Sequence, residues 1–175
     1  MTARRWRRGA DDGAAAVEFA LLFPLFLTLV FGIINMGFAF NQKINMTQAS
    51  REASRYGATL SLAASNQSGG VLNGTVDTWL AKVQSVAKAA AGDDLDATSH
   101  TGVYVCVAYV STTQTKSLTQ GTGGPASSAP CYADGRTDDR VQVVMRSDSV
   151  LDFLLVGGKI TLGSSSVTRF EAKPV

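Results

Sequence analysis

The chain has 175 residues, which is enough for one domain of modest size and too few for a second large core. Its net charge of +2 belongs to the first thirteen residues, where four arginines and two aspartates precede Ala14; the rest holds twelve basic and twelve acidic residues. A neutral main part without a basic stripe gives no support for nucleic-acid binding, so no nucleic-acid partner is expected.

A long apolar segment follows the basic leader. From Ala14 to Phe40 the sequence has 27 residues, and Glu18 is the single formal charge among them. As a helix this segment reaches roughly 40 Å, whereas the hydrocarbon core of a bilayer is about 30 Å thick. We therefore predict a membrane-spanning helix over residues 14–40. Because four arginines precede it and only Lys43 follows closely, the N-terminus is expected in the cytoplasm.

A cleaved secretory signal is the competing interpretation of this segment. The apolar region of such a signal has about 7–15 residues and ends at a small-residue cleavage site. Here the apolar run is longer, and the following FNQKINMTQ offers no convincing site of that kind. A retained anchor is favoured. Pro24 lies inside the span, which predicts a local kink or a missing hydrogen bond.

Helical periodicity continues beyond the span. From Asn41 to Leu62 apolar residues recur mostly at steps of three and four, and we expect one long helix to leave the membrane and enter the exported part. SNQSGG, Ser65–Gly70, has the composition of a flexible connector. A second helix is predicted from Thr75 as its cap to Ala91, ended by Gly92. The apolar positions expected to face the core are Ile44, Met46, Ala49, Ala53, Tyr56 and Leu60 in the first helix, and Val76, Trp79, Leu80, Val83, Val86, Ala87 and Ala90 in the second.

The remaining sequence predicts strands. Val103–Val110 and Arg140–Arg146 are rich in β-branched residues. Lys159–Ala172 is a third strand, with a break or bulge expected at Gly163. Ser111–Ala129 is expected to be a loop, and Ser149–Leu155 an apolar excursion, packed on the sheet or exposed, before a turn at Gly157 and Gly158. The fold class is therefore α+β: a long N-terminal transmembrane helix that continues into an exported domain with a second helix and a small antiparallel sheet.

Two cysteines, Cys106 and Cys131, fall in the part expected to be exported. In an oxidising compartment an even pair favours a disulfide. Such a bond would close a loop of about 25 residues, and chain entropy alone suggests roughly 3 kcal/mol of stabilisation. The alternative is a pair of unpaired thiols, one buried in a strand and one in a loop.

Catalytic and metal-binding patterns are sparse. The lone histidine, His100, has no recognisable partner pattern, and no lysine follows the glycines at 121–124 as a phosphate loop would require. The aspartates at 134, 138 and 139 lack EF-hand spacing, so a solvated turn is the better interpretation. We expect no metal, no cofactor and no enzymatic activity.

Glu18 requires its own explanation. A carboxylate near the bilayer centre costs about 2.5–3.5 kcal/mol on insertion scales, and less near the edge. One explanation places Glu18 at the cytoplasmic interface, with the span starting at Phe19. However, the order of basic leader, Gly13, AAAV, Glu18 and apolar helix also resembles the processing site of type IV-like prepilins. That resemblance implies a prepilin peptidase that cuts between Gly13 and Ala14, which makes Glu18 the fifth mature residue. The nearby pair Gly9-Ala10 lacks this glutamate.

A second resemblance covers more of the chain. GAAAVEFALLFPLFLTLVFGIINMGFAF followed by NMTQASREASRYGA resembles the start of TadE-type pseudopilins, the minor pilins of tight-adherence (Flp-type IV) pili. The tail from Arg140 is similar to that family's ending, whereas residues 60–139 carry no usable resemblance. The implied organisation is a leader over 1–13, a transmembrane helix over 14–40, a periplasmic extension of that helix over 41–64 and an exported α+β domain over 71–175.

The resemblance also implies a location, partners and a function. The protein would sit in the bacterial inner membrane with its C-terminal domain in the periplasm, and could enter the extracellular pilus. Its partners would be the prepilin peptidase, other Tad/Flp pilins, the inner-membrane assembly platform and membrane lipid. Its role would be in pilus assembly, priming and adhesion. A minor or priming role is favoured over the main shaft, because the main fibre subunits of these pili are typically much shorter than 175 residues. An uncleaved, membrane-anchored periplasmic scaffold or binding domain is the first alternative, and a membrane-tethered enzyme the second.

Overall fold

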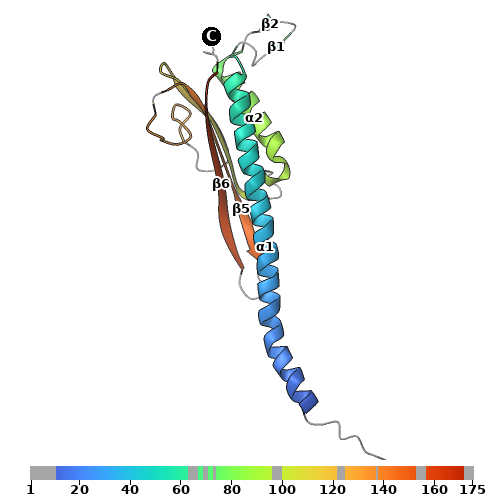
Figure 1. The fold of residues 1–175 in the computed structure, drawn as a ribbon. Helices are drawn as coiled ribbons and strands as arrows, with labels where there is room; N and C mark the ends of the chain where they lie inside the picture. Colours follow the sequence, from blue (N-terminus) through green and yellow to red (C-terminus); the bar gives the residue numbers. More distant parts are fainter. Residues whose placement is uncertain are drawn as a thin grey trace, which may run out of the picture.

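The chain folds as a long helix that carries an α+β domain on its C-terminal half (Figure 1). In this computed structural model the described residues are 11–62, 67–68, 71–72, 74–95, 100–121, 125–136, 138–152 and 157–171. Their elements, in chain order, are α1 (Asp11–Thr59), β1 (Gln67–Ser68), β2 (Val71–Leu72), α2 (Val76–Ala91), the 3₁₀ turn η2 (Gly92–Leu95), β3 (Thr101–Val110), β4 (Thr115–Gly121), β5 (Arg140–Asp152) and β6 (Gly157–Arg169). The predicted fold class is confirmed: a long apolar N-terminal helix, a second helix and a four-stranded antiparallel sheet.

Some predicted features lie outside the described residues. They are the first ten residues of the leader, most of the connector at 65–70 and the end of the apolar excursion, 153–155. Strand β1 lies within that connector and pairs with β2, with Gln67 opposite Leu72.

The main sheet has the strand order β4-β3-β5-β6, and every neighbouring pair is antiparallel. Val107 at the centre of β3 lies opposite Leu118 of β4 and Val143 of β5, and Val143 lies opposite Ser166 of β6. The register between β3 and β5 shifts between Thr101 and Tyr104, where Gly102 has φ +66°. Because side chains alternate along each strand, this register gives the sheet one face toward the helices and one away from them.

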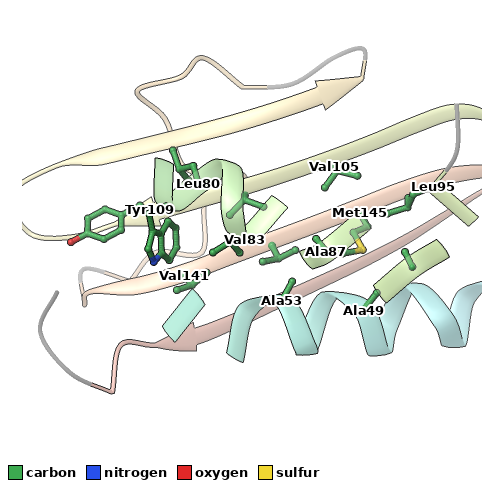
Figure 2. Close-up of a cluster of buried hydrophobic side chains, with 14 of the residues drawn as sticks. Ala49, Ala53, Leu80, Val83, Ala87, Leu95, Val105, Tyr109, Val141 and Met145 are labelled. Atoms are coloured by element: carbon green, nitrogen blue, oxygen red, sulfur yellow. The ribbon is translucent and has the colours of Figure 1, made fainter. Parts of the chain in front are cut away.

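The core lies between the sheet and the two helices. The C-terminal half of α1 and the whole of α2 pack side by side on one face, as Figures 1 and 2 show. Trp79 of α2 is fully buried; its ring meets Tyr109 edge-on at 5.4 Å, and its indole N–H donates to Leu60 O at 3.1 Å. The other side chains of this cluster are aliphatic, chiefly from α2, β3 and β5: Leu80, Val83, Ala87, Leu95, Val105, Val107, Val141, Val143 and Met145.

Helix α1 approaches the sheet closely because its packed face beyond Met46 is made of small residues. Met46, Ala49 and Ala53 lie in the core, as predicted, and Gly57 stands where an added Cβ would meet Trp79 at 3.0 Å. Toward the edge strand β6 the contact becomes polar. The Ser50 hydroxyl bonds that of Ser164 at 2.9 Å, and Ser54 bonds Ser166 and Thr168 at 2.7 and 3.0 Å.

Helix α2 begins and ends where the sequence predicts. The backbone N–H of Thr75 donates to Thr78 Oγ1 at 2.8 Å, and the backbone N–H of Thr78 donates back to Thr75 Oγ1 at 3.4 Å. This reciprocal cap satisfies donors that a helix start leaves unpaired. Gly92, with φ +58°, closes the helix, and its backbone N–H donates to Lys88 O. Six apolar residues of α2 are buried, five of them as predicted. Val86 is only half-buried, and Ala91 is buried in place of Ala90, which is exposed.

The predicted strands needed three corrections. The loop expected over 111–129 contains β4, which pairs with β3 along seven positions. β5 runs on to Asp152, so the start of the expected apolar excursion is part of a strand, and Gly157 and Gly158 are paired with Asp152 and Leu151 rather than forming a turn. β6 is continuous through Gly163, which lies opposite Arg146; an added Cβ there would make only ordinary contacts, so no bulge is needed.

One expectation for α1 also changed. The side chain of Ile44 is 53% exposed rather than part of the core, because the packed face passes through Gln42 and Met46 instead. Pro24 lies inside α1, where its missing N–H leaves one helix hydrogen bond unmade, and the Thr28 hydroxyl donates to Pro24 O at 2.8 Å.

Candidate functional site

The predicted processing residues lie on the first turns of α1. Gly13, Ala14 and Glu18 are all exposed, and an added Cβ at Gly13 would meet nothing within 4 Å. Ala14 and Glu18 are four residues apart, so they stand on the same face of the helix, with Cβ atoms about 5–6 Å apart. The structure therefore brings Glu18 within one turn of the bond predicted to be cut, and no part of the folded domain covers that bond.

An exposed apolar surface surrounds Glu18 and continues for most of the predicted span. Phe19 is 65% and Leu25 is 70% exposed, although a soluble helix would bury such residues. The large apolar side chains exposed between 17 and 40 are Val17, Phe19, Leu21, Leu22, Phe23, Leu25, Phe26, Leu29, Phe31, Ile33, Ile34, Met36, Phe38 and Phe40. Among the described residues, α1 is the one helix long and apolar enough to cross a membrane, which is consistent with single-pass anchoring.

The change from exposed to packed surface is abrupt. Ala39 is the first buried residue of α1, Gln42 is the second, and Gln42 Nε2 donates to Ser147 Oγ of β5 at 3.1 Å. The exposed part from Ala14 to Phe38 is 25 residues, about 37 Å of helix. Helix α1 is thus divided into a largely exposed apolar half and a half that is part of the domain core.

The segment REASRYG lies within the packed half of α1. Ala53, Ser54 and Gly57 face the sheet and α2, whereas Arg51 and Arg55 are exposed on the outer side together with Glu52. The spacing of this segment therefore follows the helix period: small residues fit the close contact, and charged residues remain in water.

The two cysteines form a disulfide, as predicted. Cys106 lies in β3 on the face away from the helices, and its bond to Cys131 holds the segment before β5 against that face. Tyr104, Val144 and Tyr132 complete a small second apolar cluster around the bond. The disulfide lies on the sheet of the α+β domain, whereas Gly13 and Glu18 lie on the exposed start of α1. The predicted site residues therefore form two separate groups.

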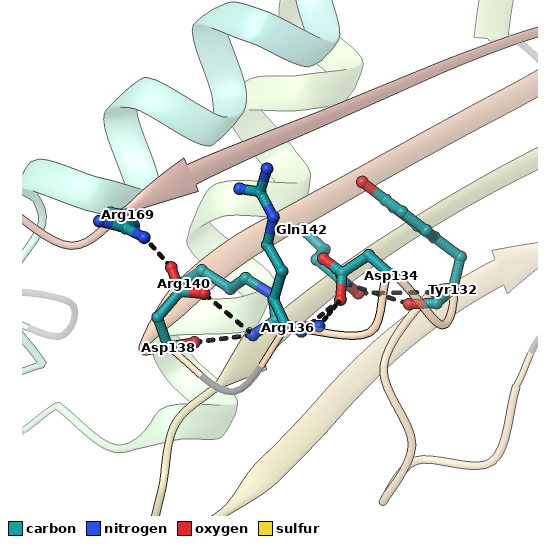
Figure 3. A network of polar contacts seen from close by, with 7 residues as sticks. All are labelled: Tyr132, Asp134, Arg136, Asp138, Arg140, Gln142 and Arg169. Atoms are coloured by element: carbon teal, nitrogen blue, oxygen red, sulfur yellow. Dashed lines mark hydrogen bonds and ion pairs between the residues drawn. The ribbon is translucent and has the colours of Figure 1, made fainter.

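An ion-pair network follows the disulfide, in the segment expected to be a solvated turn (Figure 3). The side chain of Arg140 is only 3% exposed; its Nη2 donates to Asp134 at 2.5 Å, and its Nη1 donates to Asp138 O at 2.7 Å. Gln142 Nε2 donates to Asp134 at 3.1 Å, and Arg169 Nε donates to Asp138 at 2.7 Å. The expectation of a solvated turn was wrong for Asp134, because the disulfide lays this segment on the start of β5.

The network lowers the pKa of both aspartates. Partial desolvation tends to raise the pKa of Asp134, but hydrogen bonds from the Arg136 backbone, Gln142 and Arg140 outweigh it and hold this pKa below its ordinary value. The pKa of Asp138 is lowered in the same way, with desolvation outweighed by Arg169 and then Arg140. Arg140 was not predicted as a functional or structural residue, although a charged residue at the start of a buried strand implies a partner.

No group of three or more histidine, cysteine, aspartate or glutamate side chains within the described ranges is placed to hold a metal ion. His100 lines a surface pocket together with Thr101 at the start of β3 and Asp148 of β5. Both Nη atoms of Arg140 are engaged in protein contacts, whereas its buried Nε has no hydrogen-bond partner among the described residues. We interpret the network as structural.

Residues 13–55 match the model of a family described as TadE-like protein. The match begins at the glycine predicted to end the leader and ends at Arg55, within the packed half of α1. It is consistent with a TadE-like protein and confirms the resemblance inferred for the start of the chain, whereas the similarity of the tail from Arg140 stays a prediction. Neither the curated proteins nor the solved structures include a match to this chain.

Proposed function

We propose that this protein is a minor pilin, or pseudopilin, of a tight-adherence (Flp-type IV) pilus, processed by a prepilin peptidase and acting in pilus assembly, priming and adhesion. The observation that carries the proposal is the TadE-like match over residues 13–55, which suggests involvement in the Tad pilus system. The match covers the whole exposed half of α1 together with most of its packed half.

The form of α1 suits a subunit that begins in a membrane and ends in a filament. Its exposed half offers apolar side chains on all sides, which lipid can cover before assembly and neighbouring helices can cover afterwards. Its packed half is held by the sheet and α2, so the domain moves with the helix as one body. Other Tad/Flp pilins and the assembly platform in the inner membrane are the proposed partners.

The Gly13–Ala14 bond is suited to proteolysis for a local reason. A peptidase binds its substrate in an extended form, so the first turn of α1 has to unwind. Glycine weakens a helix by roughly 1 kcal/mol relative to alanine, and an added Cβ at Gly13 would meet nothing within 4 Å, so no packing at that residue resists unwinding. The peptidase would act on the cytoplasmic side, where the arginine-rich leader is expected.

Cleavage would create a positive charge one helical turn from Glu18. The new α-ammonium group of Ala14 and the Glu18 carboxylate would both be unfavourable in hydrocarbon, and pairing reduces that cost. The pair forms within one subunit, or between Glu18 and the N-terminus of a neighbour in the filament. A carboxylate near a helix N-terminus is also stabilised by the helix dipole. In this function the protein is not an enzyme and uses no cofactor.

The N-terminal residue of the protein isolated from membranes tests the proposal. Mass spectrometry should find Ala14 at the N-terminus, and Gly13→Leu should leave the leader attached while the domain stays folded, because nothing packs on Gly13. Gly9→Leu is the matched control and should still be cleaved after Gly13. An intact leader, or a cut beyond Phe40, would instead support an uncleaved anchored scaffold or a secreted domain.

A further inference from the structure

A shallow apolar groove marks the place where α1 leaves the domain. Its volume is about 290 Å³, and Met36, Ala39, Phe40 and Lys43 of α1 form one wall. The other wall is the stretch Ile160–Gly163 of β6. The side chain of Met36 is 43% exposed and that of Phe40 is 64% exposed, so this surface is an extension of the exposed half of α1 rather than of the core.

The thickness of a bilayer places this groove at the membrane surface. If Glu18 marks the cytoplasmic edge, the hydrocarbon core begins at Phe19, and about 20 helical residues cover its thickness of about 30 Å. The outer edge then falls at Phe38. Ala39 and Phe40 of the groove follow immediately, so no spacer separates the bilayer from the domain.

The end of the β5–β6 hairpin reaches the same level. Ser54 lies against Ser166, and Ser50 lies against Ser164, so two residues of β6 advance about as far as four residues of α1. Continuing this spacing brings Gly158 about level with Phe38. Figure 1 shows the hairpin running beside α1 toward its N-terminal half.

The side chains at this end of the hairpin suit a membrane surface. Val150 is 52% exposed on the face away from α1, and Ile160 is partly exposed on the face toward it. Lys159 lies opposite Val150 and is exposed, and Lys43 lines the groove. Apolar side chains with lysines at their margin are typical of surfaces that enter the interfacial layer, because lysine extends its ammonium group to lipid phosphates.

We propose that Val150, Lys159 and Ile160, together with the groove beside α1, form a second membrane contact in the outer interfacial layer of the bilayer. This surface is continuous with the exposed half of α1, and its lysines complement an anionic lipid surface. The contact fixes the domain against the bilayer instead of leaving it free to rotate about a single helix. The proposal rests on α1 as the membrane anchor, and it does not depend on cleavage of the leader.

Site-specific fluorescence in vesicles tests this contact. The full chain is reconstituted in phosphatidylcholine vesicles containing phosphatidylglycerol, with an environment-sensitive label at Val150→Cys. The chain has two native cysteines, both in the disulfide, so the new thiol is labelled selectively without reductant. Thr112→Cys is the matched control. Thr112 is exposed just beyond Val110, which pairs with Arg140 at the start of β5, so it lies at the end of the sheet away from the β5–β6 hairpin. Leu29→Cys reports on the anchor itself.

Quenchers attached to lipids near the headgroups should quench the label at position 150 several-fold more than the label at position 112. The label at position 29 should respond to quenchers deep in the acyl chains. The proposal is overturned if labels 150 and 112 respond alike while label 29 is in lipid. It is also overturned if label 150 is shielded from water but not reached by lipid quenchers, since a second copy of the chain would then cover the surface.

Discussion

Glu18 is the single charged side chain on the exposed apolar half of α1 within residues 13–38, and its position rather than its environment explains it. Nothing in the folded domain contacts it, so the domain gains no stability from its charge. Under the proposed function, this carboxylate would lie one turn from the N-terminus that cleavage creates. Glu18 would then act in cleavage, in assembly of the cleaved subunit, or in both.

Replacing the Glu18 carboxylate with an amide isolates its charge. We expect Glu18→Gln to impair cleavage after Gly13 or assembly of the cleaved subunit, because the amide keeps the shape but cannot pair with an ammonium group. Mass spectrometry of the N-terminus and recovery of the protein in sheared pili measure the two steps separately.

Glu52→Gln is the matched control for this substitution. Glu52 is an exposed glutamate of the same helix, outside the span, and its replacement should leave both steps unchanged. Normal cleavage together with normal assembly of Glu18→Gln would show that the charge is merely tolerated at the interface.

Arg140 has a structural role that the sequence did not reveal. Its guanidinium group is buried between Asp134 and Asp138, and removing one partner of a buried pair leaves the other without compensation. We expect Arg140→Met to destabilise the domain by about 3 kcal/mol, since breaking a buried pair costs about 3–5 and Asp134 retains some exposure. Urea unfolding of the detergent-solubilised protein, followed by near-ultraviolet circular dichroism, measures the loss. Lys116→Met provides the control, because its pair with Asp77 is exposed and exposed pairs contribute little.

The same network predicts how stability depends on pH. The pKa values of Asp134 and Asp138 are lower in the folded state than their ordinary value of 3.8. Their contribution is therefore present above that value and is lost as the pH falls through the folded pKa values. Unfolding midpoints measured between neutral pH and pH 3 should fall in the acid range, and less steeply in Asp134→Asn. Parallel curves for the two proteins would contradict the role of Asp134.

At the scale of single elements, α1 combines two surfaces with opposite requirements. Its first half exposes large apolar side chains, and its second half buries small ones against the sheet and Trp79. Gly57 is the extreme case, because Trp79, Val141 and Val83 all lie 3.0–3.2 Å from the position of an added Cβ. A glycine weakens a helix in isolation, so its presence here reflects the closeness of the helix to the core.

This closeness predicts that Gly57→Ala destabilises the domain although alanine favours helices. Overpacking a core typically costs about 1–3 kcal/mol, and Val141 and Val83 have little freedom to move. Gly37→Ala is the control in the same helix, where an added Cβ meets nothing within 4 Å, and its unfolding midpoint should be unchanged or slightly higher. Equal midpoints for the two variants would mean that α1 can shift away from Trp79 at no cost.

The elements that the sequence predicted well are those whose signals are local. The cap at Thr75, the stop at Gly92 and the helical period of α1 all act within a few residues. β4 was missed because TKSLTQG is as polar as the loop around it, and what makes it a strand is the free edge of β3. The length of β5 was underestimated for a similar reason, since Ser147–Asp152 is stabilised by pairing with β6 and has little strand signal of its own.

At the scale of the whole molecule, the candidate site was predictable only in part. The pairing of Cys106 with Cys131 was predicted from residue types and is confirmed. The processing site from Gly13 to Glu18 was inferred from a resemblance to prepilins and stays a prediction. The burial of Arg140 was not predicted, because it depends on the disulfide bringing residues 131–134 over β5. The position of the β5–β6 hairpin along α1 was also out of reach, because it requires the register of β6 on α1.

Besides the backbone itself, the disulfide links the sheet covalently to the segment that covers its outer face. Replacing both Cys106 and Cys131 with alanine should destabilise the domain by about 3 kcal/mol, because a loop of 25 residues loses its closure in the unfolded chain. The loss of local stability should differ between the two faces of the sheet. Hydrogen exchange should rise first at Tyr132–Arg136, whereas the α2 amides, which pack on the other face, should stay protected at low denaturant.

Uneven exchange would show that the two faces of the sheet differ in how they are held. The helix face is kept by a continuous apolar cluster, whereas the outer face has only Tyr104, Val144 and Tyr132 around the disulfide and the Arg140 network beside it. If both faces loosened together in the cysteine variant, the disulfide would be supporting the sheet itself. Reductant added to the wild-type protein should reproduce the effect, and it should change nothing further in the variant.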